Sequence, residues 1–184
     1  MKKLNLIIIL AMVLALTGCG SSDKKNQPGG TGNGVTQGAD DAASKGEQKE
    51  GYEFVGNGVT IPMNVEAEPI IKALGDSQSY FEAASCAFQG LDKMYTYAGF
   101  EVDTYPNDGV DYISSVDIKD DTVSTLEGIS IGSTFDEVKA AYGEDYTESS
   151  GAYTYIKGDS RLTFIIKDDA VDAITYLANV EELQ

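Results

Sequence analysis

The chain has 184 residues and carries 30 Asp and Glu against 13 Lys and Arg, a formal net charge of −17 at pH 7. Proteins bind phosphate backbones through clustered Lys and Arg, so this charge excludes nucleic acid as a partner. The sequence also contains no His and no Trp. Without His, a Ser-His-Asp triad, a Cys-His pair and the usual zinc and copper sites are excluded.

The N-terminal segment is typical of a secretory signal peptide. Lys2 and Lys3 precede an almost unbroken apolar run from Leu4 to Leu16. About 13 residues are too few to cross a hydrocarbon core of ~30 Å as a helix. Because Cys19 directly follows Leu16-Thr17-Gly18, we expect residues 1–18 to be cleaved off.

The Leu-Thr-Gly-Cys sequence at 16–19 resembles the lipobox of bacterial lipoproteins. The resemblance implies that Cys19 carries covalent diacylglycerol and acyl lipid, with no other cofactor expected. It places the mature protein on the extracytoplasmic, outer face of the cell membrane, with the membrane as a partner through the lipid anchor. Two or three acyl chains anchor stably, because each buried CH₂ contributes about 0.8 kcal/mol.

Residues 19–51 are expected to form a disordered Gly/Ser-rich tether, because Val35 is their only large apolar side chain. From Tyr52 onward the chain has 7 Lys and Arg against 25 Asp and Glu, a formal charge of −18. A cationic protein, a polyamine, a divalent cation or simple solubility would each fit this charge. Cys86, the cysteine that remains beside a lipidated Cys19, is expected to be a buried thiol.

Segments of similar sequence recur in the same order after Tyr52. Gly58-Val59-Thr60-Ile61 resembles Gly128-Ile129-Ser130-Ile131, and residues 110–114 resemble residues 171–175. We therefore expect residues 52–184 to fold as two tandem α+β repeats, about 58–125 and about 128–180. Each repeat is expected to contain a short helical segment followed by a three-stranded antiparallel meander.

In the first repeat we expect one helix followed by three strands. The helix ends at Leu74, and its regular part starts as late as Glu68, because Pro69 is tolerated only in the first turn of a helix. The three strands are Met94–Ala98, Phe100–Tyr105 and Val110–Ile118. The sequence does not decide whether Ser77–Gln89 is a helix, a strand or a loop. Tyr80, Ala84 and Phe88 would form an apolar stripe along a helix, but the position of the segment before a meander also allows a strand or a loop.

The second repeat has the clearer pattern. Ser133 and Thr134 each precede an acidic residue by three positions, which predicts a capped helix over 135–142 ending at Gly143. Three strands follow, Tyr153–Lys157, Leu162–Ile166 and Val171–Leu177, separated by residues typical of turns.

The run Gly128–Val138 with Tyr142-Gly143 resembles the tandem-repeat fold of β-lactamase inhibitor protein and the small lipoprotein of the outer-membrane β-barrel assembly machinery. Both relatives act by binding proteins. The resemblance therefore implies a non-catalytic module that binds a protein partner at the cell surface.

Tyrosines provide the candidate binding surface. Alternation along a strand places Tyr95 with Tyr97, and Tyr153 with Tyr155, on one face of the sheet. If those faces are open, the four tyrosines form an aromatic surface suited to protein contact. If helices cover them, they belong to the core, and we expect about half of the strand tyrosines to be core.

Acids around one turn are weak candidates for a calcium site, namely Asp103, Asp108 and Asp111. An EF-hand loop that starts at Asp103 would need Gly sixth and Glu twelfth, but Gly109 is seventh and Ser114 twelfth. We therefore predict no metal ligands and keep calcium, another cation or a small ligand as the alternative function. Paired acids also serve glycosidases, but no sequence pattern flanks them here, so no enzyme and no catalytic residues are predicted.

Overall fold

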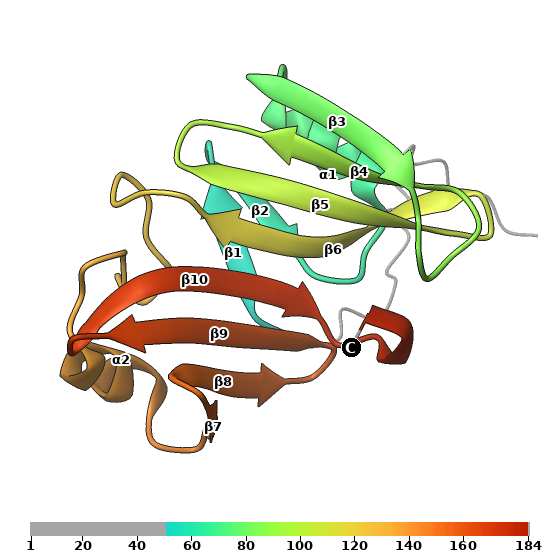
Figure 1. The fold of residues 1–184 in the computed structure, drawn as a ribbon. Helices are drawn as coiled ribbons and strands as arrows, with labels where there is room; N and C mark the ends of the chain where they lie inside the picture. The colour runs from blue at the N-terminus through green and yellow to red at the C-terminus, as the bar shows by residue number, and fades with distance from the viewer. Residues whose placement is uncertain (1–50, 184) are drawn as a thin grey trace, which may run out of the picture. The chain divides into compact units, whose positions relative to one another are not determined.

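The computed structural model describes residues 51–183 (Figure 1). The expectations for the signal peptide, for the lipid on Cys19 and for the tether lie outside these residues. Within residues 51–183, no helix is both long and apolar enough to cross a membrane.

An antiparallel sheet of eight strands organises the described part of the chain. Its strand order is β3-β4-β5-β6-β10-β9-β8-β7, so β6 and β10 pair at the centre. The strands are β3 Ser79–Ala84, β4 Leu91–Thr96, β5 Phe100–Asn107, β6 Val110–Ile118, β7 Thr147–Ser149, β8 Ala152–Lys157, β9 Ser160–Lys167 and β10 Ala170–Ala178.

A separate hairpin packs on one face of this sheet. It consists of β1 (Glu53–Gly56) and β2 (Val59–Pro62), joined by Asn57 and Gly58, which both have positive φ. Asn-Gly is the preferred pair for such a two-residue turn, so the sequence contains a local signal for this hairpin. The ring of Phe54 is fully buried and lies 5.1 Å from that of Phe100.

Two helices cover the same face as the hairpin. α1 (Ala67–Leu74) lies behind β3 and β4 in Figure 1, and α2 (Phe135–Tyr142) packs its Tyr142 ring against Phe164 of β9. A capping box between Thr134 and Glu137 fixes the start of α2. A short 3₁₀ helix, η1 (Glu181–Leu183), follows β10. We call this face of the sheet the covered face.

The core lies between the covered face and these elements. It is made of side chains that are almost fully buried, including Phe54, Ile61, Phe100, Val102, Ile113, Val116, Val138, Tyr155, Leu162, Phe164, Ile174 and Tyr176. Alternate residues of each strand enter it, so the other face of the sheet is left to solvent.

The predicted α+β architecture of two tandem helix-plus-meander repeats is wrong. Residues 51–183 are mostly β, with 49% in strands and 14% in helix, and their strands form one continuous eight-stranded sheet and a separate two-stranded sheet. Each half of the large sheet has four strands, because 79–84 and 147–149 pair as further strands. Hydrogen bonds between β6 and β10 then join the halves into one sheet.

The predictions for individual helices and strands agree with the structure better than the predicted architecture does. The helix at 135–142 and the strand Val110–Ile118 have the expected bounds, and the remaining predicted strands agree within three residues at each end. Segment 77–89 is a strand followed by a loop, because pairing with β4 overrides the helical spacing of its apolar residues. Cys86 is exposed in that loop, so the expectation of a buried thiol was wrong.

The close approach of the hairpin to the sheet predicts the effect of Gly56→Ala. A Cβ atom on Gly56 would lie 2.5 Å from Cζ of Phe100 and 2.8 Å from Cε1 of Phe54. Both rings are fully buried and cannot swing away, so the overpacking should destabilise the domain by about 1 to 3 kcal/mol. Urea denaturation followed by circular dichroism measures this loss. Val55→Ala, in the same strand but exposed, is the matched control and should stay within about 0.5 kcal/mol of wild type.

Candidate functional site: the open face of the sheet

The strand register determines which side chains lie opposite the covered face, on what we call the open face. Asp103 pairs with Ser115 and Met94, and none of the three belongs to the core cluster. Following such pairs across the sheet gives a continuous row, the mixed rank. Its members are Phe81, Met94, Asp103, Ser115, Leu177, Arg161 and Ile156.

A second row, the hydroxyl rank, runs parallel to the first across all eight strands. Its members are Ser79, Thr96, Glu101, Asp117, Thr175, Thr163, Thr154 and Thr147. Four neighbouring pairs are linked by side-chain hydrogen bonds, and two of them involve acids: Thr96 Oγ1 donates to Glu101 Oε2 at 3.0 Å, and Thr175 Oγ1 donates to Asp117 Oδ1 at 2.7 Å. These bonds hold the central carboxylates in fixed positions.

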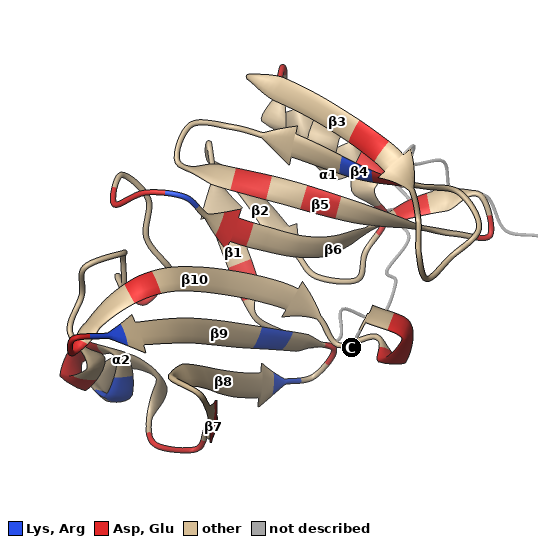
Figure 2. Cartoon of the chain, viewed as in Figure 1, with Lys and Arg blue, Asp and Glu red and all other residues tan. Residues whose placement is uncertain are grey.

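Apolar side chains mark the two ends of the open face. Phe81 on β3 is 62% exposed and Ile156 on β8 is 60% exposed, with Met94 and Ile165 also exposed. Acidic residues occupy the middle, on β5 and β6 (Figure 2). The open face therefore combines an acidic centre with apolar ends, a composition that suits contact with another molecule.

Three of these acids are close together. One carboxylate oxygen each from Glu101, Asp103 and Asp117 lies within 4.8 Å of the others. Lys119 compensates part of the charge through an ion pair of 3.2 Å to Glu101. The pKa of Asp103 is raised to about 6, chiefly by burial and also by the charges of Asp117 and Glu101, while a 3.0 Å hydrogen bond from Ser115 opposes the shift.

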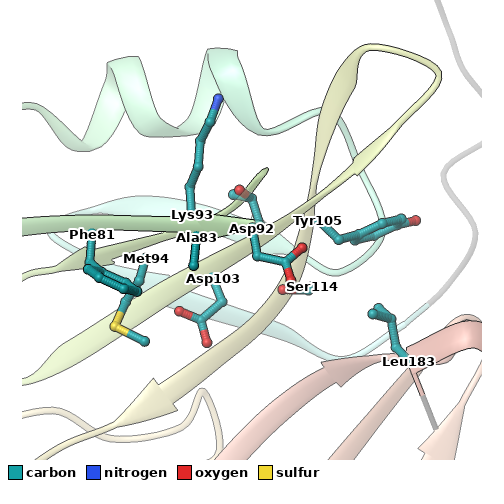
Figure 3. A pocket seen from close by; sticks show the side chains of 10 residues that line it. Phe81, Ala83, Asp92, Lys93, Met94, Asp103, Tyr105, Ser114 and Leu183 are labelled. Carbon is teal, nitrogen blue, oxygen red and sulfur yellow. The ribbon is translucent and has the colours of Figure 1, made fainter. Parts of the chain in front are cut away.

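A pocket of about 220 Å³ opens at the β3 end of this face (Figure 3). Its floor and walls come from β3, β4, β5, the middle of β6 and η1, and are formed by Phe81, Ala83, Asp92, Met94, Asp103, Tyr105, Ser114 and Leu183. Lys93 borders the pocket but points to the opposite side, where its Nζ lies 2.5 Å from Asp111 Oδ2.

The four candidate tyrosines do not form the open face. Tyr97 and Tyr155 are buried in the core. Tyr95 and Tyr153 are half-buried on the covered face, against Tyr80 and Phe135 respectively. Of the seven tyrosines expected in strands, Tyr97, Tyr105, Tyr155 and Tyr176 are buried, whereas Tyr95, Tyr112 and Tyr153 are half-buried, in agreement with the expectation that about half are core.

The three acids named as weak calcium candidates are not brought together. Asp103 lies on the open face, Asp108 lies in the exposed turn after β5, and Asp111 pairs with Lys93 on the covered side. Asp103 instead joins Glu101 and Asp117. The sequence contains a partial signal for this grouping, because Glu101 and Asp103 are two residues apart and so share a face, as do Ser115 and Asp117. Only the strand register shows that these two pairs lie opposite each other.

Comparison with known proteins gives no match: no family model, no curated protein and no solved structure is significantly similar to this chain. The resemblance described for residues 128–143 therefore stays an expectation. The function is argued from the site itself.

The raised pKa of Asp103 predicts that Asp103→Asn stabilises the protein at pH 7. Ionisation is less favourable in the folded state, where the pKa is about 6, than in the unfolded chain, where it is 3.8. Removing that charge should therefore increase the free energy of unfolding by about 1 to 2 kcal/mol at pH 7, after allowance for partial exposure. The gain should shrink as the pH falls from 6 to 4, because Asp103 then becomes protonated in the folded state while it is still largely ionised in the unfolded chain, and this difference stabilises the wild-type protein.

Urea denaturation at pH 7.5 and at pH 4 measures both parts of this expectation. Asp108→Asn is the control, because Asp108 is exposed and its positive φ is equally acceptable to Asn. A loss of stability in Asp103→Asn at pH 7.5 would contradict the argument.

Proposed function

We propose that the chain is a lipid-anchored, extracytoplasmic bacterial lipoprotein that binds another protein through the open face of its eight-stranded sheet and has no catalytic role. The anchor rests on the lipobox at 16–19 and on Cys19. The binding role rests chiefly on the open face, where exposed Phe81 and Ile156 lie at opposite ends of one row of side chains.

The size of the open face supports a macromolecular partner. The mixed rank crosses seven strands, and neighbouring strands lie about 4.8 Å apart, so its ends are roughly 30 Å from each other. A small ligand would contact only part of such a row. A protein surface could contact the apolar ends and the acidic centre together.

The acidic centre favours a partner with basic residues. Beyond the local carboxylates, the chain from Tyr52 onward has a formal charge of −18, which repels acidic proteins and attracts basic ones over a Debye length of about 8 to 10 Å. The hydrogen bonds of the hydroxyl rank hold Glu101 and Asp117 in place before any partner arrives, which reduces the entropy lost on binding.

The arrangement of the carboxylates on the open face does not favour catalysis of hydrolysis. Glycosidases place their two carboxyl groups about 5 to 9.5 Å apart on opposite sides of the scissile bond, whereas Glu101, Asp103 and Asp117 all lie on the same face of the sheet, with one carboxylate oxygen of each within 4.8 Å of the others. The absence of His from the sequence removes the commonest general base. Both observations support a non-catalytic role.

One observation favours the alternative function, which is binding of calcium or another cation. Carboxylate oxygens are the ligands that Ca²⁺ prefers, and the three acids Glu101, Asp103 and Asp117 could supply three of the six to eight it needs. A rise in melting temperature with millimolar calcium, abolished by Asp117→Asn, would favour this alternative over protein binding.

The lipid anchor predicts the effect of Cys19→Ser on the whole chain in its host. Without the thiol no lipid can be attached, so the protein should leave the membrane fraction almost completely. Immunoblots of membrane and soluble fractions, with metabolic labelling by a fatty acid, measure this. Cys86→Ser is the matched control and should keep both lipid and membrane location. Persistence of labelled Cys19→Ser in the membrane would disprove the anchor.

The binding role predicts a position-dependent effect of a new positive charge. A photocrosslinker at Thr163 on the open face of the anchored protein should form a covalent adduct with one partner in intact cells. Ile156→Arg should reduce that adduct about tenfold, because it brings a positive charge into the contact between the open face and a basic partner. Leu126→Arg adds the same charge at a residue of equal exposure, 61%, outside the sheet, and should change little.

The adduct is identified by mass spectrometry and quantified by immunoblot. Equal losses in Ile156→Arg and Leu126→Arg, or an adduct insensitive to both, would contradict binding through the open face.

A further inference from the structure

We propose that the pocket between β3, β4, β5 and η1 receives the side chain of an arginine from the protein partner. The proposal rests on the proposed function, and it specifies which chemical group of the partner is recognised. The pocket combines apolar walls with two carboxylates, each of which has one oxygen without a hydrogen-bond partner, and this combination fits an amphipathic cation.

The two carboxylates of the pocket are incompletely satisfied. Oδ1 of Asp92 and Oδ1 of Asp103 are both buried, and neither has a hydrogen-bond partner within residues 51–183. The second oxygen of Asp103 accepts the hydroxyl of Ser115. A buried acceptor without a partner destabilises the protein, and more so when it is charged, so a donor that enters the pocket would supply the hydrogen bonds that these oxygens lack.

No Lys or Arg within residues 51–183 donates to these two oxygens. Lys93 points away from the pocket (Figure 3) and forms an ion pair with Asp111, and Lys119 is paired with Glu101. Glu101 and Asp117 lie next to Asp103 and add to the negative charge. The negative charge at the pocket is therefore only partly compensated, by Lys119.

The walls suit the aliphatic part of an arginine and its planar head. Phe81 and Met94 pair across β3 and β4 and are both exposed, while Ala83 and Leu183 complete the apolar lining. An arginine stem packs on such surfaces, and its guanidinium is attracted to the face of an aromatic ring such as Phe81. Its five donors also allow one guanidinium to serve two separate carboxylates, which the compact ammonium of lysine does less well.

The volume limits the occupant. About 220 Å³ lies below the roughly 300 Å³ at which pockets begin to hold drug-sized molecules. The pocket therefore accommodates one side chain rather than a folded segment. The rest of the partner would lie over the mixed rank, which continues from Met94 and Asp103 toward Ile156.

Methionine methyl groups give a direct test in the full, anchored chain solubilised in detergent. Met94 lines the pocket, whereas Met63 is buried in the core and serves as an internal control. With ¹³C-methyl methionine labelling, the probe is N-acetyl-arginine amide, compared with its uncharged citrulline analogue, with N-acetyl-lysine amide and with spermidine. We expect the arginine probe to shift the Met94 signal in a saturable way and to leave the Met63 signal unchanged. The citrulline analogue should shift neither signal.

Asp103→Asn and Asp92→Asn should each weaken the arginine response about tenfold, the loss expected for one charged hydrogen bond. An unchanged Met63 signal shows that each variant is folded. Asp108→Asn, an exposed acid outside the pocket, should leave the response unchanged.

Three outcomes would overturn the assignment: a silent Met94 signal, an equal response to citrulline, or a response to spermidine that exceeds the one to arginine. The first two would leave the crosslink at Thr163 intact if the open face still binds a protein, so failure of the pocket and failure of the proposed function are distinguishable.

Discussion

The pairing of β6 with β10 is the interaction on which the rest of the domain depends. It joins the two four-stranded halves through Ile118 with Ile174 and Val116 with Tyr176, whose side chains all enter the core. The same register fixes the other face, where Asp117 lies opposite Thr175 and Ser115 opposite Leu177. Because side chains alternate along a strand, a slip of one residue would bury Asp117 and expose Val116. The apolar core therefore determines the register that assembles the open face.

Local elements of this fold could be predicted from the sequence, but their assembly could not. The helix at 135–142 has a capping box and a glycine stop, which are local signals, and the structure contains both. By contrast, segment 79–84 has apolar residues at helical spacing and becomes a strand only because β4 offers it a partner. Pairing of this kind depends on residues distant in sequence, so propensity is overridden. The expected three-stranded meanders failed for this reason.

The candidate site shows the same division between local and long-range information. Alternation correctly predicted that Tyr153 and Tyr155 share a face, but it could not say that α2 covers that face. The acids near the β5–β6 turn are close in sequence, yet antiparallel pairing and a bulge after Asp103 send Asp103 and Asp111 to opposite sides of the sheet. The group formed by Glu101, Asp103 and Asp117 spans two strands, so only the register reveals it.

Because only one face of the sheet is covered, the residues that stabilise the domain differ from those that we propose bind the partner. The hairpin, α1 and α2 bury the large apolar residues of one face of the sheet, including Phe100, Phe164 and Tyr176, and this burial supplies the main stabilising term. The open face contributes little to that core and contains a carboxylate, Asp103, that is less stable as an ion in the folded protein than in water. A charge retained at such a position lowers stability, which is understandable if the carboxylate acts in binding. Pairing with a cation from a partner would reverse the cost, because the ionised form would then be the favoured one. The acidic centre of the open face therefore makes best physical sense as half of an interface whose other half is basic.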